Sequence, residues 1–352
     1  MENKLNFDFK TTQQVIQQIG LIDSFKGRWT AIEKKEHRYL RELKRIATIE
    51  STGSSTRIEG ATLTDKEVEN LLKHVKISDL KSREEQEVVG YYETLDVILD
   101  TYADIPLTEN YIKQFHGMLL KYSNKDSRHR GEYKSLSNKV VAKYPGGKQA
   151  VIFNTTAPHL VKKEMEELLG WTNQVFSEGK LHPLIIIGAF VYEFLSIHPF
   201  QDGNGRLARL LTTLLLLKHQ YLFVQYVSFE NLIEERKKDY YKALMTDQKN
   251  RYKKNERIDQ WELFFLGCME SLIRKLEKKY EAYSKKGAYL NDRQKKILEI
   301  VKKQAPVKLN DILNSIRGLS RNTLKKDLVY LVDQNMVSRM GQGRSSVYRM
   351  KE

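Results

Sequence analysis

Cysteine is almost absent from this chain of 352 residues, which contains only Cys268. A single thiol cannot form an internal disulfide, so the composition favours a protein of the reducing cytoplasm over a disulfide-stabilised secreted one. Cys268 stands in an apolar helical stretch with no basic residue close in sequence, which predicts a buried core thiol and not a nucleophile. Cysteines and histidines nowhere have the spacing of a zinc site.

Long uninterrupted apolar runs are absent as well. The longest are broken by Glu193 and Arg209 and fall short of a membrane span, and the first eight residues have no apolar signal core. We therefore expect no membrane partner. There is no internal repeat and no low-complexity segment. With 40% hydrophobic and 30% charged residues, the chain has the composition of a soluble protein with room for two or three domains.

Positive charge is in excess and unevenly distributed. The formal net charge is +15, and residues 291–352 hold 14 basic and 6 acidic residues. This concentration at one end indicates a nucleic-acid partner, with a solvated basic surface as the alternative.

The pattern within this basic segment predicts three helices, at 292–302, 307–316 and 320–332, the last capped by Ser320. Two β-prone runs, 336–340 and 346–350, then flank a Gly-Gln-Gly-Arg turn. This order resembles the winged-helix domain. The resemblance implies a recognition helix and a wing tip that carry the DNA-contacting residues Arg321, Asn322, Thr323, Lys325, Lys326 and Arg344. Winged helices also bind proteins, so both kinds of partner stay open.

The most informative stretch is His-Pro-Phe-Gln-Asp-Gly-Asn-Gly-Arg-Leu-Ala-Arg at 198–209. Apolar runs on both sides, 183–195 and 207–217, predict two core helices joined by this short link. Gly203 and Gly205 allow the backbone to approach an anion closely. The first amides of the second helix lack internal partners, and the helix dipole favours negative charge there. The geometry suits the phosphates of a nucleotide.

The polar side chains of the stretch fit the same chemistry. Arg206 and Arg209 are three residues apart and would both meet the phosphates. Asp202 could hold magnesium against the phosphate oxygens. His198 is the group whose ordinary pKa suits proton abstraction near neutral pH.

The stretch resembles the signature of Fic-domain proteins, His-Pro-Phe-x-(Asp/Glu)-Gly-Asn-Gly-Arg-x-x-Arg, at every specified position. The resemblance implies a mostly helical fold and transfer of AMP from ATP to a protein hydroxyl. It implies that His198 is the base, that Asp202 binds Mg²⁺, and that Asn204 and the surrounding amides hold the phosphates. Arg206 and Arg209 would hold the distal phosphates.

A second segment, Ser-Thr-Arg-Ile-Glu-Gly at 55–60, resembles the family's inhibitory motif, (Ser/Thr)-x-x-x-Glu-(Gly/Asn). Ser55 and Glu59 are four apart, hence on one face of a short helix, which we place at about 52–60 and which Gly60 would end. By resemblance, Glu59 pairs with Arg209 and inhibits the enzyme; the alternative is that Glu59 faces solvent.

Two further regions are expected at the site. The β-prone runs around Pro-Gly-Gly at 139–153 predict a hairpin, and the preceding Gly-Glu-Tyr-Lys at 131–134 resembles the family's entry to its flap, although arginine is commoner where Lys134 stands. Such a flap docks an extended target by strand addition, here through Val151 and Ile152, unless it is a plain surface hairpin. Tyr241 is the candidate for contact with adenine. His116 lies in a helical run and is expected to be structural.

The sequence therefore predicts a mainly α protein in four parts. These are an N-terminal helical region (1–105), a Fic core with a β-hairpin flap (106–245), a helical connector (246–289) and a winged helix-turn-helix domain (290–352). The predicted function is Mg²⁺-dependent transfer of AMP from ATP to Tyr, Ser or Thr hydroxyls of a target protein and of the chain itself. Use of another nucleotide, removal of AMP, or a DNA-binding regulator with a nucleotide-sensing Fic domain are the alternatives. Homodimer formation stays open.

Overall fold

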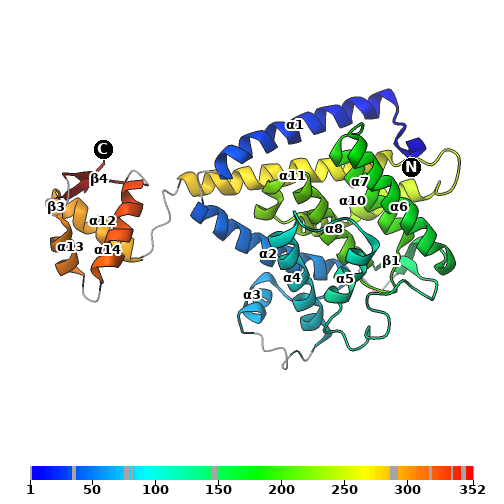
Figure 1. Ribbon diagram of the computed structural model, residues 1–352, viewed down its shortest axis with the longest axis horizontal. Coiled ribbons are helices and arrows are strands. Elements are labelled where there is room, and N and C mark those ends of the chain that lie inside the picture. The colour runs from blue at the N-terminus through cyan, green and yellow to red at the C-terminus, as the bar shows by residue number, and fades with distance from the viewer. Residues whose placement is uncertain are drawn as a thin grey trace. The chain divides into compact units, whose positions relative to one another are not determined.

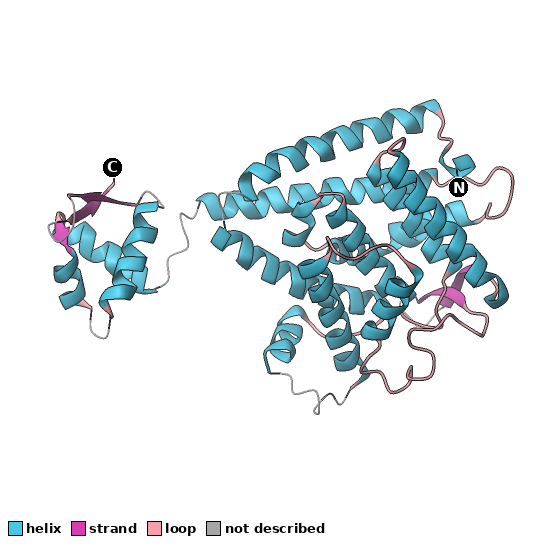
Figure 2. Cartoon of the chain, in the orientation of Figure 1, coloured by secondary structure: helices cyan, strands magenta, loops and turns pink. Residues whose placement is uncertain are grey.

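The structure is a computed structural model that describes residues 2–33, 37–74, 80, 82–143, 149–285, 292–316, 319–333, 336–341 and 346–351. The chain divides into two compact units, Met1–Glu277 and Lys278–Glu352 (Figure 1). Helices make up most of both units. The described strands form one hairpin in the first unit and a small sheet in the second (Figure 2).

The first unit begins with a short 3₁₀ helix, and a further one precedes α9. Its elements in chain order are η1 (Glu2–Leu5), α1 (Phe9–Glu33), α2 (His37–Glu59), α3 (Asp65–His74), α4 (Arg83–Thr101), α5 (Glu109–Leu119), β1 (Lys139–Lys143), β2 (Gln149–Asn154), α6 (Pro158–Glu178), α7 (Pro183–Ile197), α8 (Asn204–Lys218), η3 (Leu222–Tyr226), α9 (Phe229–Glu235), α10 (Lys237–Gln248) and α11 (Asp259–Lys285).

Helices α7 and α8 form the centre of this unit, as their apolar sequences predict. Pro183 occupies the first turn of α7, where its missing N–H costs nothing, and His182 caps the helix by accepting a hydrogen bond from the Leu184 amide. Every α7 residue after Pro183 is buried. Helix α6 packs on α7, while α2, α4 and α5 pack on α8. The link between α7 and α8 is thereby held on a rigid core.

Helix α2 differs from the sequence prediction. The motif of Ser55 and Glu59 was expected on a short helix at 52–60, but it forms the last turns of a helix of 23 residues that ends at Glu59. Residues 51–56 are buried, and α2 packs against α4, α8 and α9. Tertiary burial therefore overrides the weak helix propensity of this Ser/Thr/Gly-rich run.

The predicted hairpin is present as the antiparallel pair β1–β2, with a register irregularity between Val140 and Val141. Val151 pairs with Val141 in this ladder. The Pro-Gly-Gly turn between the strands falls outside the described residues.

Beyond the end of α11, the described residues of the second unit form three helices and a three-stranded antiparallel sheet of order β3-β5-β4. Its elements are α12 (Asp292–Gln304), β3 (Val307–Lys308), α13 (Leu309–Ser315), α14 (Arg321–Asp333), β4 (Val337–Met340) and β5 (Val347–Met350). One buried cluster joins all six elements: Ile297, Val301, Val307, Ile312, Leu324, Leu328, Leu331, Val337 and Tyr348.

The predicted second helix of this unit was wrong at its start. Val307 and Lys308 pair with β5 as a short strand, and the helix begins at Leu309. Val307 is buried in the core cluster while Lys308 is exposed, an alternation that a strand satisfies. The cap of α14 was right: the Thr323 amide donates to Ser320 Oγ at 3.1 Å.

The predicted recognition helix is α14, on which Arg321, Asn322, Lys325 and Lys326 are all exposed. Arg344 falls outside the described residues. Within the described chain, no helix combines the length and the apolar character needed to cross a membrane.

Candidate active site

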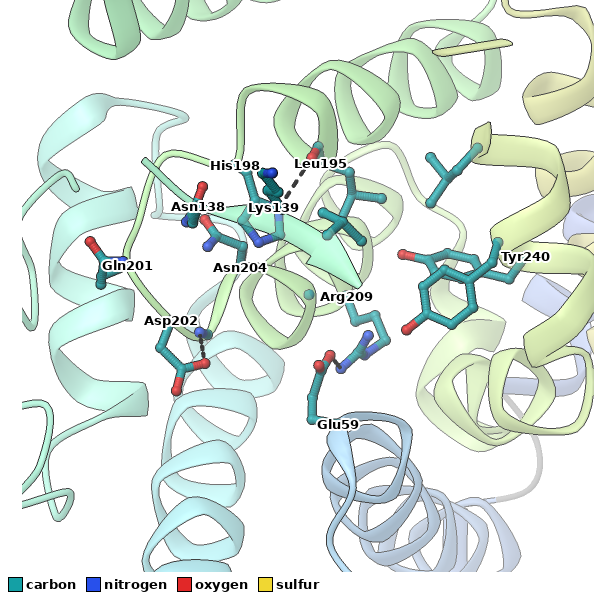
Figure 3. Close-up of a pocket in the computed structure, with 15 residues that line it drawn as sticks. Glu59, Asn138, Lys139, Leu195, His198, Gln201, Asp202, Asn204, Arg209 and Tyr240 are labelled. Atoms are coloured by element: carbon teal, nitrogen blue, oxygen red, sulfur yellow. Dashed lines mark hydrogen bonds and ion pairs between the residues drawn. The ribbon is translucent and has the colours of Figure 1, made fainter. Parts of the chain in front are cut away.

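A pocket of about 260 Å³ lies where the α7–α8 link faces the hairpin, the end of α2 and helix α10 (Figure 3). Four parts of the chain that are distant in sequence therefore meet at one cavity. Its lining residues are Glu59, Asn138, Lys139, Val140, Leu195, His198, Gln201, Asp202, Gly203, Asn204, Gly205, Arg209, Tyr240, Tyr241 and Leu244.

His198 ends α7 in a left-handed conformation, with φ 53°, and its amide donates to Phe194 O at 2.9 Å. Its ring Nδ1 lies 3.3 Å from Leu195 O, an acceptor, so Nδ1 carries the proton and Nε2 keeps its lone pair. Burial, together with the charge of Lys134, lowers the pKa of His198 to about 4. The imidazole is therefore neutral near pH 7 and able to take a proton.

The link after His198 is held in shape by Asn204. Asn204 Oδ1 accepts from the Phe200 amide and Nδ2 donates to Phe200 O, each at 2.8 Å. The side-chain amide is thus occupied in fixing the backbone, and the residue is 1% exposed. Any help that Asn204 gives to phosphates in this conformation comes through the shape of the loop.

His116 contacts the α7–α8 link and has the structural role that the sequence predicted for it. Its Nδ1 accepts from the Gly131 amide at 2.8 Å, so Nε2 donates to Asp202 O at 3.0 Å. The ring stacks on Phe200 with centroids 3.8 Å apart. Gly203 has φ 78°, and a side chain there would be strained and would press on Leu119.

Asp202 lies between two arginines at the end of the pocket formed by the α7–α8 link. Its Oδ2 accepts from Arg83 at 2.7 Å, and its Oδ1 accepts from Arg206 at 3.3 Å and from the Gly203 amide at 2.6 Å. Burial opposes ionisation, but the arginines and the amide outweigh it and lower the pKa of Asp202. Asp202 is therefore a carboxylate that meets the pocket.

The donor set fits magnesium bound together with a nucleotide. Within the described residues, no three His, Cys, Asp or Glu side chains cluster to hold a metal unaided. Magnesium commonly binds one or two protein carboxylates and completes its coordination shell with waters and phosphate oxygens. The single carboxylate of Asp202 therefore provides the protein ligand that a nucleotide-bound Mg²⁺ ion needs.

The two motif arginines have different surroundings. Arg206 is 1% exposed, lies 3.2 Å from Glu87 and 3.3 Å from Asp202, and is not among the lining residues. In this conformation it orients Asp202, and its contact with phosphates stays a prediction. Arg209 lines the pocket directly.

Arg209 is bound by both residues of the predicted inhibitory motif. Its Nε donates to Ser55 Oγ at 2.8 Å, and its Nη2 donates to Ser55 O at 2.9 Å and to Glu59 Oε1 at 2.8 Å. Figure 3 shows Glu59 reaching from the end of α2 towards Arg209. Glu59 is thus paired with Arg209 and does not merely face solvent, although its side chain is 35% exposed.

Glu59 also occupies the start of α8. A Cβ on Gly205 would come within 2.4 Å of Glu59 Oε1, so the carboxylate rests against this glycine in the first turn. Burial raises the pKa of Glu59, but the charges of Arg209 and Arg206 outweigh it and give a net lowering. An ionised carboxylate thus stands where the helix dipole favours an anion.

Two tyrosines of α10 line the side of the pocket opposite the Asp202 end. Tyr240 is 5% exposed and packs edge-on against Trp261 and Phe264, so much of its ring belongs to the core. Tyr241 is less buried and lies edge-on to Tyr240 at 5.2 Å. Burial raises the pKa of Tyr241 to about 12, which keeps the phenol neutral. Of the two tyrosines, Tyr241 therefore remains the better candidate for contact with the adenine of a nucleotide.

Several residues near the site escaped the sequence analysis. Arg83 binds Asp202 from α4, at a sequence separation of 119, and no local pattern indicates that contact. Asn138 and Leu195 line the pocket. Lys134 was noticed only as an unusual residue before the flap, yet its charge is close enough to lower the pKa of His198.

Known proteins resemble this chain in part of its sequence and in its fold. A sequence model described as the Fic/DOC family matches residues 106–216. A Fido domain-containing protein of Dictyostelium discoideum is 36% identical over 74 residues, which are 21% of this chain and 52% of that protein. The protein adenylyltransferase Fic of Drosophila willistoni is 27% identical over 207 residues, 58% of this chain and 39% of that protein. The chain thus spans about half or less of the length of these curated relatives.

Solved structures share the fold. A crystal structure of a Fic family protein from Desulfovibrio desulfuricans has a TM-score of 0.65 at 24% identity and covers 96% of this chain and 95% of its own. A Fic domain-containing signaling protein from Bacteroides thetaiotaomicron has a TM-score of 0.58 at 24% identity and covers 73% of this chain and 94% of its own. Residues 106–216 are thus a Fic/DOC domain, and the homologues of the chain include Fic adenylyltransferases.

Proposed function

We propose that the first unit transfers AMP from ATP to Tyr, Ser or Thr hydroxyls of a target protein and of itself. The observation that carries this proposal is the neutral imidazole of His198 in one pocket with the start of α8 and Arg209. Nucleotide binding alone needs no base, so the intact histidine favours an enzyme over a purely sensory domain.

The chain's own groups account for the chemistry as follows. The acceptor hydroxyl attacks the α-phosphorus, a new O–P bond forms, and the bond to the β-phosphate oxygen breaks. The hydroxyl proton passes to His198 Nε2, and pyrophosphate leaves. The first amides of α8 and the guanidinium of Arg209 hold the phosphates, and catalysis consists chiefly of positioning and charge stabilisation.

Magnesium would be held by Asp202 and the phosphates, and it would neutralise charge on the departing pyrophosphate. Arg83 and Arg206 keep Asp202 ionised and in place.

We further propose that the enzyme is held in a low-activity state by Glu59. Its carboxylate occupies Arg209 and the first turn of α8, so ATP would bind with its distal phosphates displaced and its α-phosphorus misaligned. Val151 and Ile152 of β2 are proposed to dock the target through strand addition.

Incubation with ATP and GTP labelled at the α-phosphorus, alone and with cell lysate, tests the activity. Label from ATP on the chain or on a lysate protein, lost in His198→Ala, supports it. Preference for GTP would indicate another nucleotide, and release of AMP from pre-labelled protein would indicate the reverse reaction. Nucleotide binding without any transfer would indicate a sensor domain.

For the second unit we propose a winged-helix domain that binds DNA. The support is its three helices, its β3-β5-β4 sheet and the exposed basic residues of α14. In the full chain, Lys325→Ala with Lys326→Ala should weaken duplex binding and reduce its salt dependence by about two charges. Unchanged duplex binding would favour a protein partner. The single cysteine keeps a cytoplasmic location as our expectation.

A further inference from the structure

Lys134 is a buried lysine bound only by uncharged oxygens. It is 3% exposed. Its Nζ donates to Asn138 Oδ1 at 2.8 Å, to Thr155 Oγ1 at 2.7 Å and to Ile197 O at 3.2 Å, which uses all three N–H groups of the ammonium. Within the described residues, no carboxylate forms an ion pair with it.

The three acceptors belong to parts of the chain that must keep a fixed relation during transfer. Asn138 precedes β1 and Thr155 follows β2, so the ammonium joins the two ends of the hairpin. Ile197 is the last residue of α7 and directly precedes His198. One side chain thus ties both ends of the hairpin to the backbone that carries the proposed base.

Neighbouring contacts extend the same connection. The Lys134 amide donates to Pro199 O at 2.8 Å, and Asn138 Nδ2 donates to Phe200 O at 2.9 Å. Thr155 Oγ1 also lies 2.6 Å from Asn138 Oδ1. The backbone on both sides of His198 is therefore bound to the base of the hairpin.

A gain in folding stability does not explain why the Lys134 ammonium is buried. An ammonium without a carboxylate loses much of its hydration, and an apolar side chain of similar volume avoids that cost. Burial lowers the pKa of Lys134 to about 8, which shows that its surroundings disfavour the charge. A role in the site is the better explanation.

We propose that Lys134 is a positioning residue that fixes the hairpin at a set distance from His198, so that a target strand paired with the hairpin presents its hydroxyl to the imidazole. This inference rests on the proposed adenylyl transfer. Lys134 does not line the pocket, so it acts through Asn138, Thr155 and Ile197 rather than on the substrate.

Two readouts are independent of enzymatic activity and of the transfer proposal. Lys134→Met should raise amide hydrogen exchange at least tenfold in β1 and β2 while exchange in the centre of α7 stays within twofold. Binding of Mg²⁺·ADP by calorimetry should change less than threefold. Lys134→Arg restores a cation with several donors and should recover slow exchange.

The rate of AMP transfer then tests whether Lys134 positions the hairpin relative to His198. The rate of AMP incorporation at saturating ATP should fall at least tenfold in Lys134→Met and stay within about threefold of wild type in Lys134→Arg. Two titratable groups are coupled electrostatically to Lys134: the Glu164 carboxylate on α6, which favours the charged ammonium, and His198 at the end of α7, which is neutral near pH 7. Because a lysine with this pKa loses its proton as the pH rises through about 8, wild-type activity should fall over that range while Lys134→Arg keeps its rate.

Lys26→Met is the matched control. This half-buried lysine of α1 also donates to a carbonyl, His219 O at 2.9 Å, far along the chain from the hairpin. Hairpin exchange that is unchanged in Lys134→Met, or faster exchange spread equally over α7, would overturn the proposal. So would a Lys134→Met enzyme with the wild-type rate. Absence of AMP transfer in both the wild type and Glu59→Gly would refute the proposed function, and the exchange measurements would still test the role of Lys134.

Discussion

Removal of the Glu59 carboxylate should activate the enzyme by an amount that follows from the structure. The carboxylate accepts one hydrogen bond of 2.8 Å from Arg209. Such charge-assisted bonds contribute about 1.5–3 kcal/mol. Arg209 is 4% exposed, but Glu59 is 35% exposed and water screens it, so we use the lower end. A restraint of about 1.5 kcal/mol corresponds to about a tenfold change.

The assay is the initial rate of AMP incorporation from ATP labelled at the α-phosphorus. Glu59→Gly should raise self-labelling at least tenfold and change ATP affinity much less, because the remaining pocket contacts are kept. Glu59→Gln removes the charge but keeps its bulk against Gly205, so its gain should be smaller. Glu42→Gln is the control, since Glu42 stands on the same helix and pairs with the exposed Arg45.

Combining Glu59→Gly with Arg209→Ala should abolish the gain, because the freed arginine is the group that we propose positions the phosphates. Equal rates for wild type and Glu59→Gly, in proteins that both bind ATP, would reject inhibition by α2. A double variant as fast as Glu59→Gly would reject the role of Arg209.

Three further outcomes are expected. His198→Ala should lose transfer and keep ATP affinity within about threefold, as measured by labelling and calorimetry, since base and binder are separate groups; undiminished labelling would refute the role. Asp202→Ala should strongly weaken Mg²⁺-dependent turnover, and equal rates in EDTA and Mg²⁺ would contradict the metal assignment. Glu262 is 0% exposed and, within the described residues, neither carboxylate oxygen has a hydrogen-bond partner. Burial raises its pKa well above the ordinary 4.5, with the nearby Asp247 adding to the shift. The folded state then binds a proton that the unfolded state releases, so the free energy of unfolding should fall as pH rises above about 4.5. Urea unfolding at pH 5 and pH 8 should show a smaller difference for Glu262→Gln than for wild type.

The parts of the fold that the sequence predicted are those with strong local signals. Helices α7 and α8 follow from apolar runs, from Pro183 at the start of one and from Gly203 and Gly205 at the start of the other. The start of α14 follows from Ser320, whose side chain caps the helix through a contact three residues away. These signals act within one or two turns, so they can be read without knowing the rest of the structure.

The parts that could not be predicted depend on contacts across the chain. The Ser/Thr/Gly run at 51–56 is a poor helix former, and it is helical because its small side chains allow close packing on α8 and α9. Val307 becomes a strand residue only because β5, forty residues further on, offers a partner. No local sequence pattern indicates that Arg83 contacts Asp202 or that Lys134 contacts Ile197, because only the fold brings these residues together.

The electrostatic features of the first turn of α8 that we propose bind phosphate also explain why the Glu59 carboxylate lies there. Unpaired amides and the helix dipole attract any anion, Gly205 permits close approach, and Arg209 supplies the opposite charge. In the proposed mechanism, Glu59 needs no separate binding site, because its carboxylate competes for the contacts that a distal phosphate of ATP would make. His198, Leu195 and Tyr241 line the same pocket, and no described hydrogen bond joins any of them to Glu59. Under the proposed mechanism, the base and the adenine-side end of the pocket stay formed while Glu59 is bound to Arg209, so displacement of this one carboxylate is expected to activate the enzyme.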